Sequence, residues 1–327
     1  NQCISLNEIN IPSSVIEIRT KAFYCCNSLK EIIIPSSVKK IENFAFSGCK
    51  SLANVSIPSS ITFMGSNIFS NCVKLNQIEM PSSITKIYGH SFDNCINLVN
   101  VSIPSSISSI NEYAFYSCQS LIKIVIPPSV TKINDFTFYD CSSLKEVELP
   151  SNLISIGKSA FNKCSALVKI NIPSSIEIIK EYAFSECSLI DEEINLSAIS
   201  VIELYSFYKC SSITQINISS SVTKIEECAF KECSSLKQIN IPDSVTSIEQ
   251  YSFCNCSSLK QINFPSSIKS IGDYSFSECS SIKEIKIPSS LSVIGDYAFS
   301  YCSSIIQVTI LSSLTSIGNY VFNECSS

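Results

Sequence analysis

The feature that most constrains this chain is a phenylalanine that returns every 23 residues without a miss. The fourteen positions are Phe23, Phe46, Phe69, Phe92, Phe115, Phe138, Phe161, Phe184, Phe207, Phe230, Phe253, Phe276, Phe299 and Phe322. Proline keeps a second column, from Pro12 to Pro288, in eleven of fourteen repeats. A fixed period of this length predicts a solenoid, in which each repeat packs only on its neighbours.

The repeat covers all 327 residues, so we expect one elongated domain over residues 1–327 and not two globular ones. Because the chain starts at Asn1 without a methionine, and partway through a repeat, we expect an excerpt of a longer protein. Apolar residues make up 45% and charged residues 16%, which argues against disorder. The net charge of −5 and the lack of a basic block argue against a nucleic-acid partner. No apolar run is long enough for a bilayer, so membrane contact would need an anchor outside this segment.

A single repeat reads as short strands and turns. In residues 233–256, Leu236, Ile239 and Ile241 form L-x-x-I-x-I, which predicts a strand with one buried face. Pro242 ends this strand, and Val245 and Ile248 point inward again from a second extended segment. Proline and β-branched residues disfavour helix. We therefore expect a β-rich, right-handed solenoid of about 14 coils with a parallel sheet and little α-helix.

One repeat departs from the pattern. Between Cys187 and Leu196 the inward isoleucine arrives one residue late, at Ile194, and Glu193 occupies its usual place. The phase recovers at Ile199. An extra residue in the strand and one fewer in the turn would explain this, either as a bulge at a partner site or as tolerated drift.

Fifteen of the eighteen cysteines share one column, three residues after the phenylalanine. Stacked coils would place them about 4.8 Å apart with parallel Cα–Cβ bonds, whereas a disulfide needs converging ones. The pattern favours a buried ladder of free thiols, which suits a reducing or low-oxygen setting. Cys25, Cys228 and Cys254 lie off the column, and Cys25 is expected to be exposed.

The consensus L-x-x-I-x-I-P-x-x-V-x-x-I-x-x-x-A-F-x-x-C resembles the BspA-like leucine-rich repeat family, the Treponema-pallidum-type class. Residues 124–127, Val130, Ile133, Phe138 and Cys141 are typical of it. The resemblance covers essentially the whole chain. It implies a non-enzymatic surface antigen of a bacterium or parasite, in which the repeats adhere to host cells or matrix proteins.

Catalytic, cofactor and metal sites find little support. His90 is the only histidine, and it occupies a column otherwise held by aromatic residues, so we expect it to fill an aromatic slot. Cys254 and Cys256 offer two sulfurs without a second pair of ligands. A glycine column, which comprises Gly65, Gly157, Gly272, Gly295 and Gly318, predicts turns with positive φ. We therefore predict no enzyme, no cofactor and no metal.

The outward side of the L-x-x-I-x-I strands is the better candidate for binding. Its apolar members are Val99, Ile122, Val125 and Val168, of which the first three come from adjacent repeats and should form one patch. Its polar members are Lys237, Gln238, Asn240, Lys260, Gln261 and Asn263. The alternatives are packing drift for the apolar residues and a solvated amide ladder for the polar ones. Asn54 and Asn100 begin N-x-S sequons on the same side.

A second stripe consists of tyrosines two residues before the core phenylalanine. Its C-terminal members are Tyr251, Tyr274, Tyr297 and Tyr320, beside acidic residues that include Asp273 and Asp296. These rings could stack on sugars or pack against a flat partner, or they could cover the edge of the phenylalanine column with their hydroxyls in water.

Two functional hypotheses follow. The first is a cell-surface or extracellular adhesion module that binds a host or matrix protein through its strands, without a cofactor. The alternative is a cytoplasmic protein-interaction scaffold, which the free thiols favour. The sequence leaves the oligomeric state open.

Overall fold

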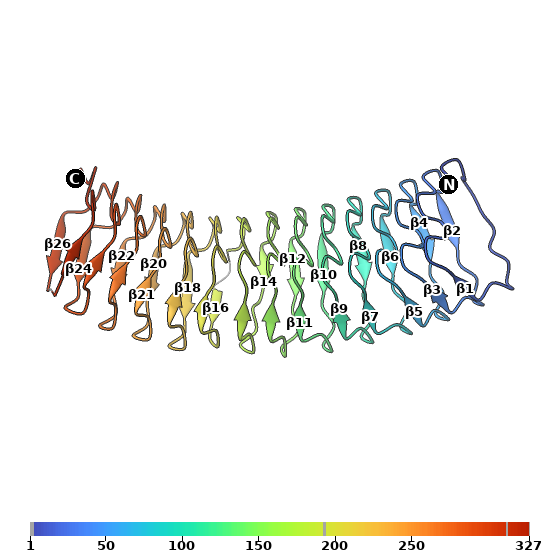
Figure 1. The fold of residues 1–327 in the computed structure, drawn as a ribbon, viewed down its shortest axis with the longest axis horizontal. Coiled ribbons are helices and arrows are strands. Elements are labelled where there is room, and N and C mark those ends of the chain that lie inside the picture. The colour runs from blue at the N-terminus through green and yellow to red at the C-terminus, as the bar shows by residue number, and fades with distance from the viewer. Residues whose placement is uncertain (1–2, 192–193, 312, 327) are drawn as a thin grey trace. The chain divides into compact units, whose positions relative to one another are not determined.

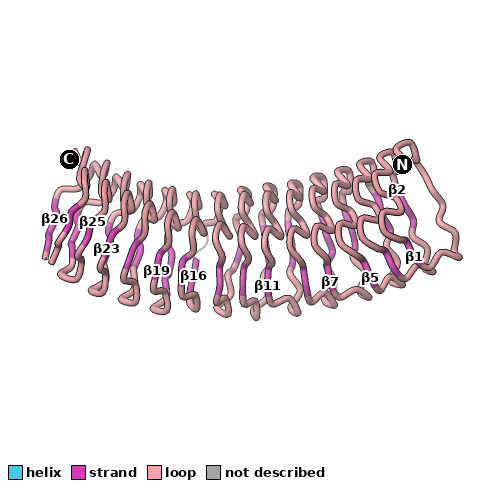
Figure 2. The backbone as a smooth tube through the Cα atoms, viewed as in Figure 1, coloured by secondary structure: helices cyan, strands magenta, loops and turns pink. Residues whose placement is uncertain are grey.

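The computed structural model describes residues 3–191, 194–311 and 313–326. It forms a parallel-strand solenoid of about 13 turns, with no helix among these residues, which confirms the predicted fold class (Figure 1). The chain divides into two compact units, residues 1–167 and 168–327. The expectation of a single domain stays a prediction. Within each unit the strands run in two lines, joined by turns (Figure 2).

Unit 1 contains strands of two or three residues. The first line carries the L-x-x-I-x-I motif and comprises β2 (Glu31–Ile33), β4 (Asn54–Ser56), β6 (Gln77–Glu79), β8 (Asn100–Ser102), β10 (Lys123–Val125) and β12 (Glu146–Glu148). The second line comprises β1 (Glu17–Ile18), β3 (Lys40–Ile41), β5 (Phe63–Met64), β7 (Lys86–Ile87), β9 (Ser109–Ile110), β11 (Lys132–Ile133) and β13 (Ser155–Ile156). Partners pair in parallel with an offset of one repeat, as Ile124 does with Val147.

Unit 2 repeats this arrangement. Its first line comprises β14 (Lys169–Ile170), β16 (Ile194–Leu196), β18 (Gln215–Ile218), β20 (Gln238–Asn240), β22 (Gln261–Asn263), β24 (Glu284–Ile287) and β26 (Gln307–Ile310). Its second line comprises β15 (Ile178–Ile179), β17 (Val201–Ile202), β19 (Lys224–Ile225), β21 (Ser247–Ile248), β23 (Ser270–Ile271), β25 (Val293–Ile294) and β27 (Ser316–Ile317).

The sheets of the first line are short. In unit 1, β2 pairs with β4, β6 with β8, and β10 with β12. In unit 2, one sheet runs β16-β18-β20-β22, and β24 pairs with β26 in another. The ladder is therefore interrupted between β4 and β6 and between β8 and β10 in unit 1, and between β22 and β24 in unit 2, although the strands on either side of each interruption remain neighbours.

The core of both units is a stack of phenylalanine rings. Successive centroids lie 5.2–5.7 Å apart in unit 1 and 5.2–5.7 Å apart in unit 2, with nearly parallel planes. Phe115 and Phe276 are fully buried. Burial of one such ring is worth roughly 1.5–3 kcal/mol, so the repeated column supplies stability that one coil alone lacks.

The cysteine column lies beside these rings as free thiols, as predicted. From Cys49 to Cys164 and from Cys210 to Cys325, each ladder Sγ donates to the carbonyl of the phenylalanine 26 residues earlier; Cys72 reaches Phe46 at 3.2 Å. Burial raises the pKa of Cys49 and of Cys233 to about 12 each, so both thiols stay protonated at neutral pH. The expectation for Cys25 was too strong, because its side chain is half-buried and not exposed.

Two residues in each coil adopt left-handed backbone conformations, on either side of the core phenylalanine. Around Phe115 these are Tyr113 (φ 58°) and Ser117 (φ 53°). The tyrosine stripe therefore occupies a left-handed position, which turns the chain while its rings stack. The non-glycine residues here carry the strain that glycine usually relieves.

The positive φ predicted for the glycine column is wrong, because Gly48 (φ 77°) is the glycine with that conformation. The five column glycines serve close approach between coils instead. A Cβ on Gly295 would lie 2.3 Å from Asp273 Oδ1 and 2.5 Å from its backbone nitrogen. Asp273 Oδ1 accepts the backbone N–H of Asp296 at 2.7 Å, so the glycine leaves room for a carboxylate that joins two coils.

The departing repeat shifts register as the sequence indicates. Ile194 pairs with Ile216 and Asn195 with Asn217, an offset of 22 residues, whereas Gln238 pairs with Gln261 at an offset of 23. Ile199 is again buried. Glu193 itself lies outside the described residues.

Candidate functional site

The outward side of the first strand line is the surface on which most predicted binding residues lie. We call it the strand face. In β10, Ile124 points into the core while Lys123 and Val125 are exposed, because side chains of a strand alternate between its two sides. Each coil adds the same pattern, so the strand face carries parallel columns of side chains about 4.8 Å apart.

The predicted apolar patch is partly assembled. Ile122 is 43% exposed and Val125 is 48% exposed. The N–H of Ile122 donates to the carbonyl of Val99 at 3.4 Å, so these two residues come from touching coils. Val99 and Val168 are half-buried, and Val168 belongs to unit 2.

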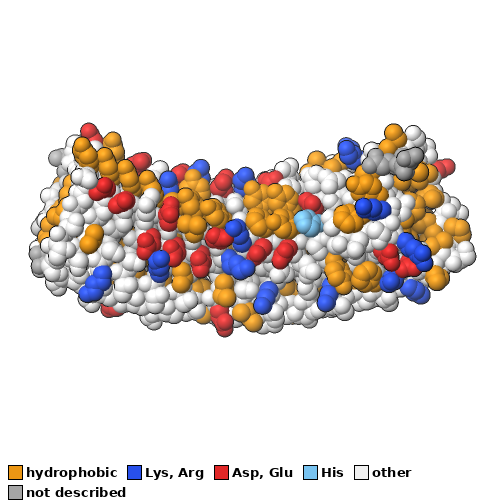
Figure 3. Space-filling view, viewed as in Figure 1, with side chains coloured by type: hydrophobic (Ala, Val, Ile, Leu, Met, Phe, Trp, Pro, Cys, Tyr) orange, Lys and Arg blue, Asp and Glu red, His pale blue; other side chains and the backbone are white. Residues whose placement is uncertain are grey.

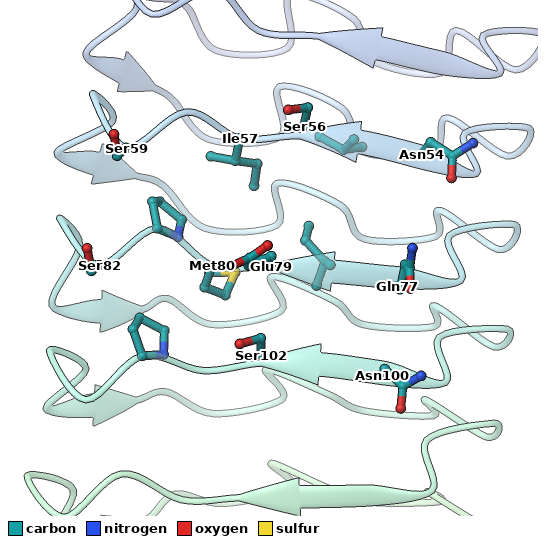
Figure 4. Close-up of a pocket in the computed structure, with 14 residues that line it drawn as sticks. Asn54, Ser56, Ile57, Ser59, Gln77, Glu79, Met80, Ser82, Asn100 and Ser102 are labelled. Carbon is teal, nitrogen blue, oxygen red and sulfur yellow. The ribbon is translucent and has the colours of Figure 1, made fainter.

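Unit 1 also has a hollow of about 970 Å³ on its strand face, over the interruption between β4 and β6. Figure 4 shows Asn54, Gln77 and Asn100 one above another on three successive strands. We call this site the amide hollow; the residues that define it are Asn54, Ser56, Gln77, Glu79, Asn100 and Ser102. Glu79 is the one charged residue among those that line it, so the site is mainly a set of neutral hydrogen-bonding groups.

Sequence reasoning missed this site. Asn54 and Asn100 stood out in the sequence only as the first residues of two N-x-S sequons. The available signal was the column itself, since amide residues fill one outward position in three consecutive repeats.

Unit 2 has a second hollow, of about 520 Å³, over the interruption between β22 and β24. We call it the lysine groove; the residues that define it are Lys260, Gln261, Asn263, Phe264, Lys283, Lys286 and Leu311. Glu284 supplies the one carboxylate of its lining. Phe264, which is half-buried, lines it together with Pro288 and Leu311, so an apolar edge borders the cationic side chains.

The predicted polar strip leads into this groove. Lys237, Gln238 and Asn240 are exposed on β20 or directly before it, and Gln238 and Asn240 pair in register with Gln261 and Asn263. Gln261 Nε2 donates to Asn263 Oδ1 at 3.0 Å, which joins two amides of the same strand.

The tyrosine stripe forms a continuous stack in unit 2. The centroids of Tyr251, Tyr274, Tyr297 and Tyr320 lie 4.7–5.0 Å apart. Each ring face is therefore covered by its neighbour, and Lys231 Nζ lies 4.8 Å from the Tyr251 centroid at one end. A partner would therefore meet ring edges and hydroxyls along the stack.

The acidic residues beside these tyrosines have partners in the protein. The backbone N–H and side-chain amide of Asn319 donate to Asp296, which lowers the pKa of that carboxyl. The row thus ties coils together, and less of its charge is open to a ligand than the sequence alone indicates.

His90 fills the aromatic slot predicted for it. Its ring stacks on Tyr113 with centroids 4.6 Å apart, and Tyr113 stacks on Phe136 at 4.8 Å. Figure 3 shows hydrophobic side chains gathered beside the single histidine. His90 Nδ1 lies 3.3 Å from Asp93 Oδ2, and the pKa of Asp93 is raised chiefly by burial, against the lowering effect of His90.

Neither a metal-binding cluster nor a membrane-spanning helix is found among the described residues. No group of three or more histidine, cysteine or acidic side chains there is placed to hold a metal ion. No helix in those ranges has the length and hydrophobicity to cross a membrane.

The sequence matches the family model of the BspA type leucine rich repeat region, in six copies over residues 1–99, 62–191 and 200–327. Among curated proteins, none matches it significantly. A leucine-rich repeat protein from Bacteroides ovatus is similar in structure, with a TM-score of 0.67, 28% identity, and coverage of 95% of this chain and 80% of that one.

A leucine rich cell surface protein from Faecalibacterium prausnitzii gives a TM-score of 0.59 and 29% identity, over 87% of this chain and 88% of the other. A leucine-rich repeat protein from Eubacterium ventriosum shares the fold at a TM-score of 0.55 and 21% identity, over 86% and 84% of the two chains.

Proposed function

Because the chain belongs to the BspA-type leucine-rich repeat family, we propose that it is a non-enzymatic recognition module displayed at a cell surface, where it attaches to a host or matrix protein. Solenoids of this family are generally protein-binding folds. The similarity to the Faecalibacterium cell surface protein supports the location.

The observation that carries the proposal is the open strand face. It offers side chains in register on a rigid backbone, and it includes exposed apolar residues at Ile122 and Val125. Exposed apolar side chains on an ordered surface favour a protein partner over nucleic acid or a lone small molecule. Many weak contacts along the face, multiplied by display of many copies on one cell, would give firm attachment without a cofactor.

The test is the double substitution Ile122→Glu and Val125→Glu, measured as attachment of the purified protein to host cells and to immobilised matrix proteins. A charge placed in an apolar contact would weaken binding by about tenfold or more, because the partner would have to desolvate it. Ile154→Glu is the matched control, since Ile154 is 37% exposed in unit 1 but lies outside the strand face. Circular dichroism verifies that each variant is folded.

Full attachment by the folded double variant would reject the apolar patch as the contact. Equal loss in the Ile154→Glu control would show that attachment depends on overall surface charge and not on the strand face.

A second candidate function is a cytoplasmic interaction scaffold. The buried free thiols favour it, because such a ladder is compatible with a reducing compartment. Labelling of intact cells with a membrane-impermeant reagent distinguishes the two: a labelled protein supports surface display, and an unlabelled protein that becomes reactive after lysis supports the scaffold.

A further inference from the structure

We infer that the lysine groove of unit 2 binds an acidic segment of a protein chain that also carries apolar side chains. This inference deepens the proposed function, on which it rests, by naming the chemistry of the partner at one place on the strand face.

The first support is an excess of positive charge at one place on a chain whose net charge is −5. Lys260, Lys283 and Lys286 line the groove together with a single carboxylate, Glu284. Lys237 extends the cationic side chains by one coil, because the N–H of Lys260 donates to the carbonyl of Lys237 at 3.1 Å.

The second support is that these charges have no internal partner. Over the described parts of the chain, no carboxylate forms an ion pair with Lys237, Lys260, Lys283 or Lys286. Lys123 on the strand face of unit 1 differs, since its Nζ lies 2.5 Å from Glu148 and 3.4 Å from Glu146. Charges without an internal partner are those that a ligand can pair with at no expense to an existing contact.

The third support is the geometry of the charges. Lys237, Lys260 and Lys283 hold the same position in consecutive coils, so their stems rise from the surface at a spacing of about 4.8 Å. Lysine is a mobile point charge that tolerates carboxylates in several orientations, whereas arginine favours fixed bidentate contacts. Such a row suits a flexible acidic segment that lies along the coil stack.

The apolar edge selects a protein segment over a sulfated polysaccharide. Pro288 and Leu311 line the groove with Phe264, which is half-buried and packs edge-on against Phe276 with centroids 5.6 Å apart. An apolar ligand side chain can cover Leu311 beside Phe264, and a polysaccharide has none to offer. Gln261 and Asn263 supply amides that can bond to a peptide backbone.

The experiment measures binding of two labelled probes by fluorescence anisotropy: a synthetic peptide of alternating glutamate and leucine residues, and a sulfated oligosaccharide of similar charge. The variant is the double substitution Lys260→Glu and Lys283→Glu. The matched control is Lys86→Glu with Lys132→Glu, two exposed lysines on the second strand line of unit 1.

We expect the peptide to bind and the groove variant to weaken that binding by about tenfold, with little change in the control. Raising the salt concentration from a low value to about 0.15 M should weaken binding of the peptide to the wild type, because salt screens exposed charge pairs. The substitution Leu311→Ser should weaken binding of the peptide but not binding of the oligosaccharide.

Peptide binding that is unchanged in the groove variant would overturn the inference. Tighter binding of the oligosaccharide, lost in the same variant and insensitive to Leu311→Ser, would assign the groove to polysaccharide and also overturn it. If the peptide does not bind in the groove while the protein still attaches to host cells or matrix proteins, the proposed function stands without this site. If attachment fails while the peptide binds as expected, the inference stands and the proposed function does not.

Discussion

The two hollows of the strand face differ in charge although they form at equivalent places. The amide hollow lies over the interruption between β4 and β6, and the lysine groove over that between β22 and β24. Neutral amides, hydroxyls and apolar side chains line the first, with Glu79 as its one charge. Lysines and an apolar edge line the second. Both hollows therefore lie over a break in the ladder, and the outward residues determine what each one can bind.

The scaffold below them is shared. Phenylalanine centroids have the same range of separations in both units, and ladder thiols in both donate to phenylalanine carbonyls at similar distances. If this comparison is right, matched core changes should have equal effects in the two units, and the units should differ only in their response to ligands.

The largest effect is expected from Phe115→Ala in unit 1 and Phe276→Ala in unit 2. Each removes a fully buried ring from the middle of a stack and should lower the free energy of unfolding by about 3–5 kcal/mol. Urea denaturation followed by circular dichroism measures both. A much smaller loss of unfolding free energy in one unit would contradict the expected similarity, because it would mean that the two cores are not packed alike.

Gly157→Ala and Gly295→Ala test the close approach of coils in each unit. The new Cβ would lie 2.6 Å from backbone atoms of residues 134 and 135 in the first case and 2.5 Å from the nitrogen of Asp273 in the second. We expect each to lower the free energy of unfolding by about 1–3 kcal/mol. Gly89→Ala is the control, since its Cβ would meet a single atom, at 3.1 Å. An equal loss of stability in this control would show that close approach between coils is not the cause.

The thiols predict an alkaline weakening that is equal in both units. The pKa of Cys49 and of Cys233 is raised to about 12 from 9.0, so the folded state holds these protons more tightly than the unfolded state. Their contribution is complete below pH 9 and is lost as the pH rises toward 12.

The stability difference between the wild type and either Cys49→Ala or Cys233→Ala should therefore shift by about 1 kcal/mol between pH 8 and about pH 10, in favour of the variant. Denaturation at both pH values measures this shift. A difference that stays constant with pH would mean that the thiols are not desolvated as described.

The smallest effect is expected from moving charge between the hollows. Gln77 and Asn100 are register partners in the amide hollow, and the double change of both to lysine should give unit 1 a binding site for the acidic peptide. We expect about a threefold gain in affinity, because exposed charge contacts are weak. As a control, the same two positions are changed to methionine, which has a side chain of similar length without charge. An equal gain in affinity for the methionine variant would show that charge does not cause the binding.

Much of the fold was predictable from the sequence, because its determinants repeat in columns. Buried Phe115, the parallel strands and the thiol ladder follow from residue type and period alone. The glycine conformation was not predictable in this way. Gly295 is needed because Asp273 of the preceding coil lies close to it. Comparing one repeat position at a time does not show that residues from two different positions are in contact.

The candidate sites were harder to predict for a similar reason. The sequence placed Lys260 and Asn263 on the strand face, where the structure has them. It did not predict the hollows, because these depend on where the hydrogen-bond ladder between neighbouring strands breaks. It also did not show that the tyrosine rings stack on one another, with the centroids of Tyr274 and Tyr297 4.7 Å apart.

The constant register between coils has a consequence for how such a protein can vary. Gln238 meets Gln261 one repeat later, so a gene that gains or loses a whole 23-residue unit keeps every interior contact in phase. A duplicated unit would lengthen a groove by one step, and an exchanged unit would alter its charge, with the remainder of the molecule unaffected. Recombination between repeats can thus diversify recognition without a search for a new fold. The 22-residue offset at Ile194 indicates that even an imperfect junction can be absorbed within one turn.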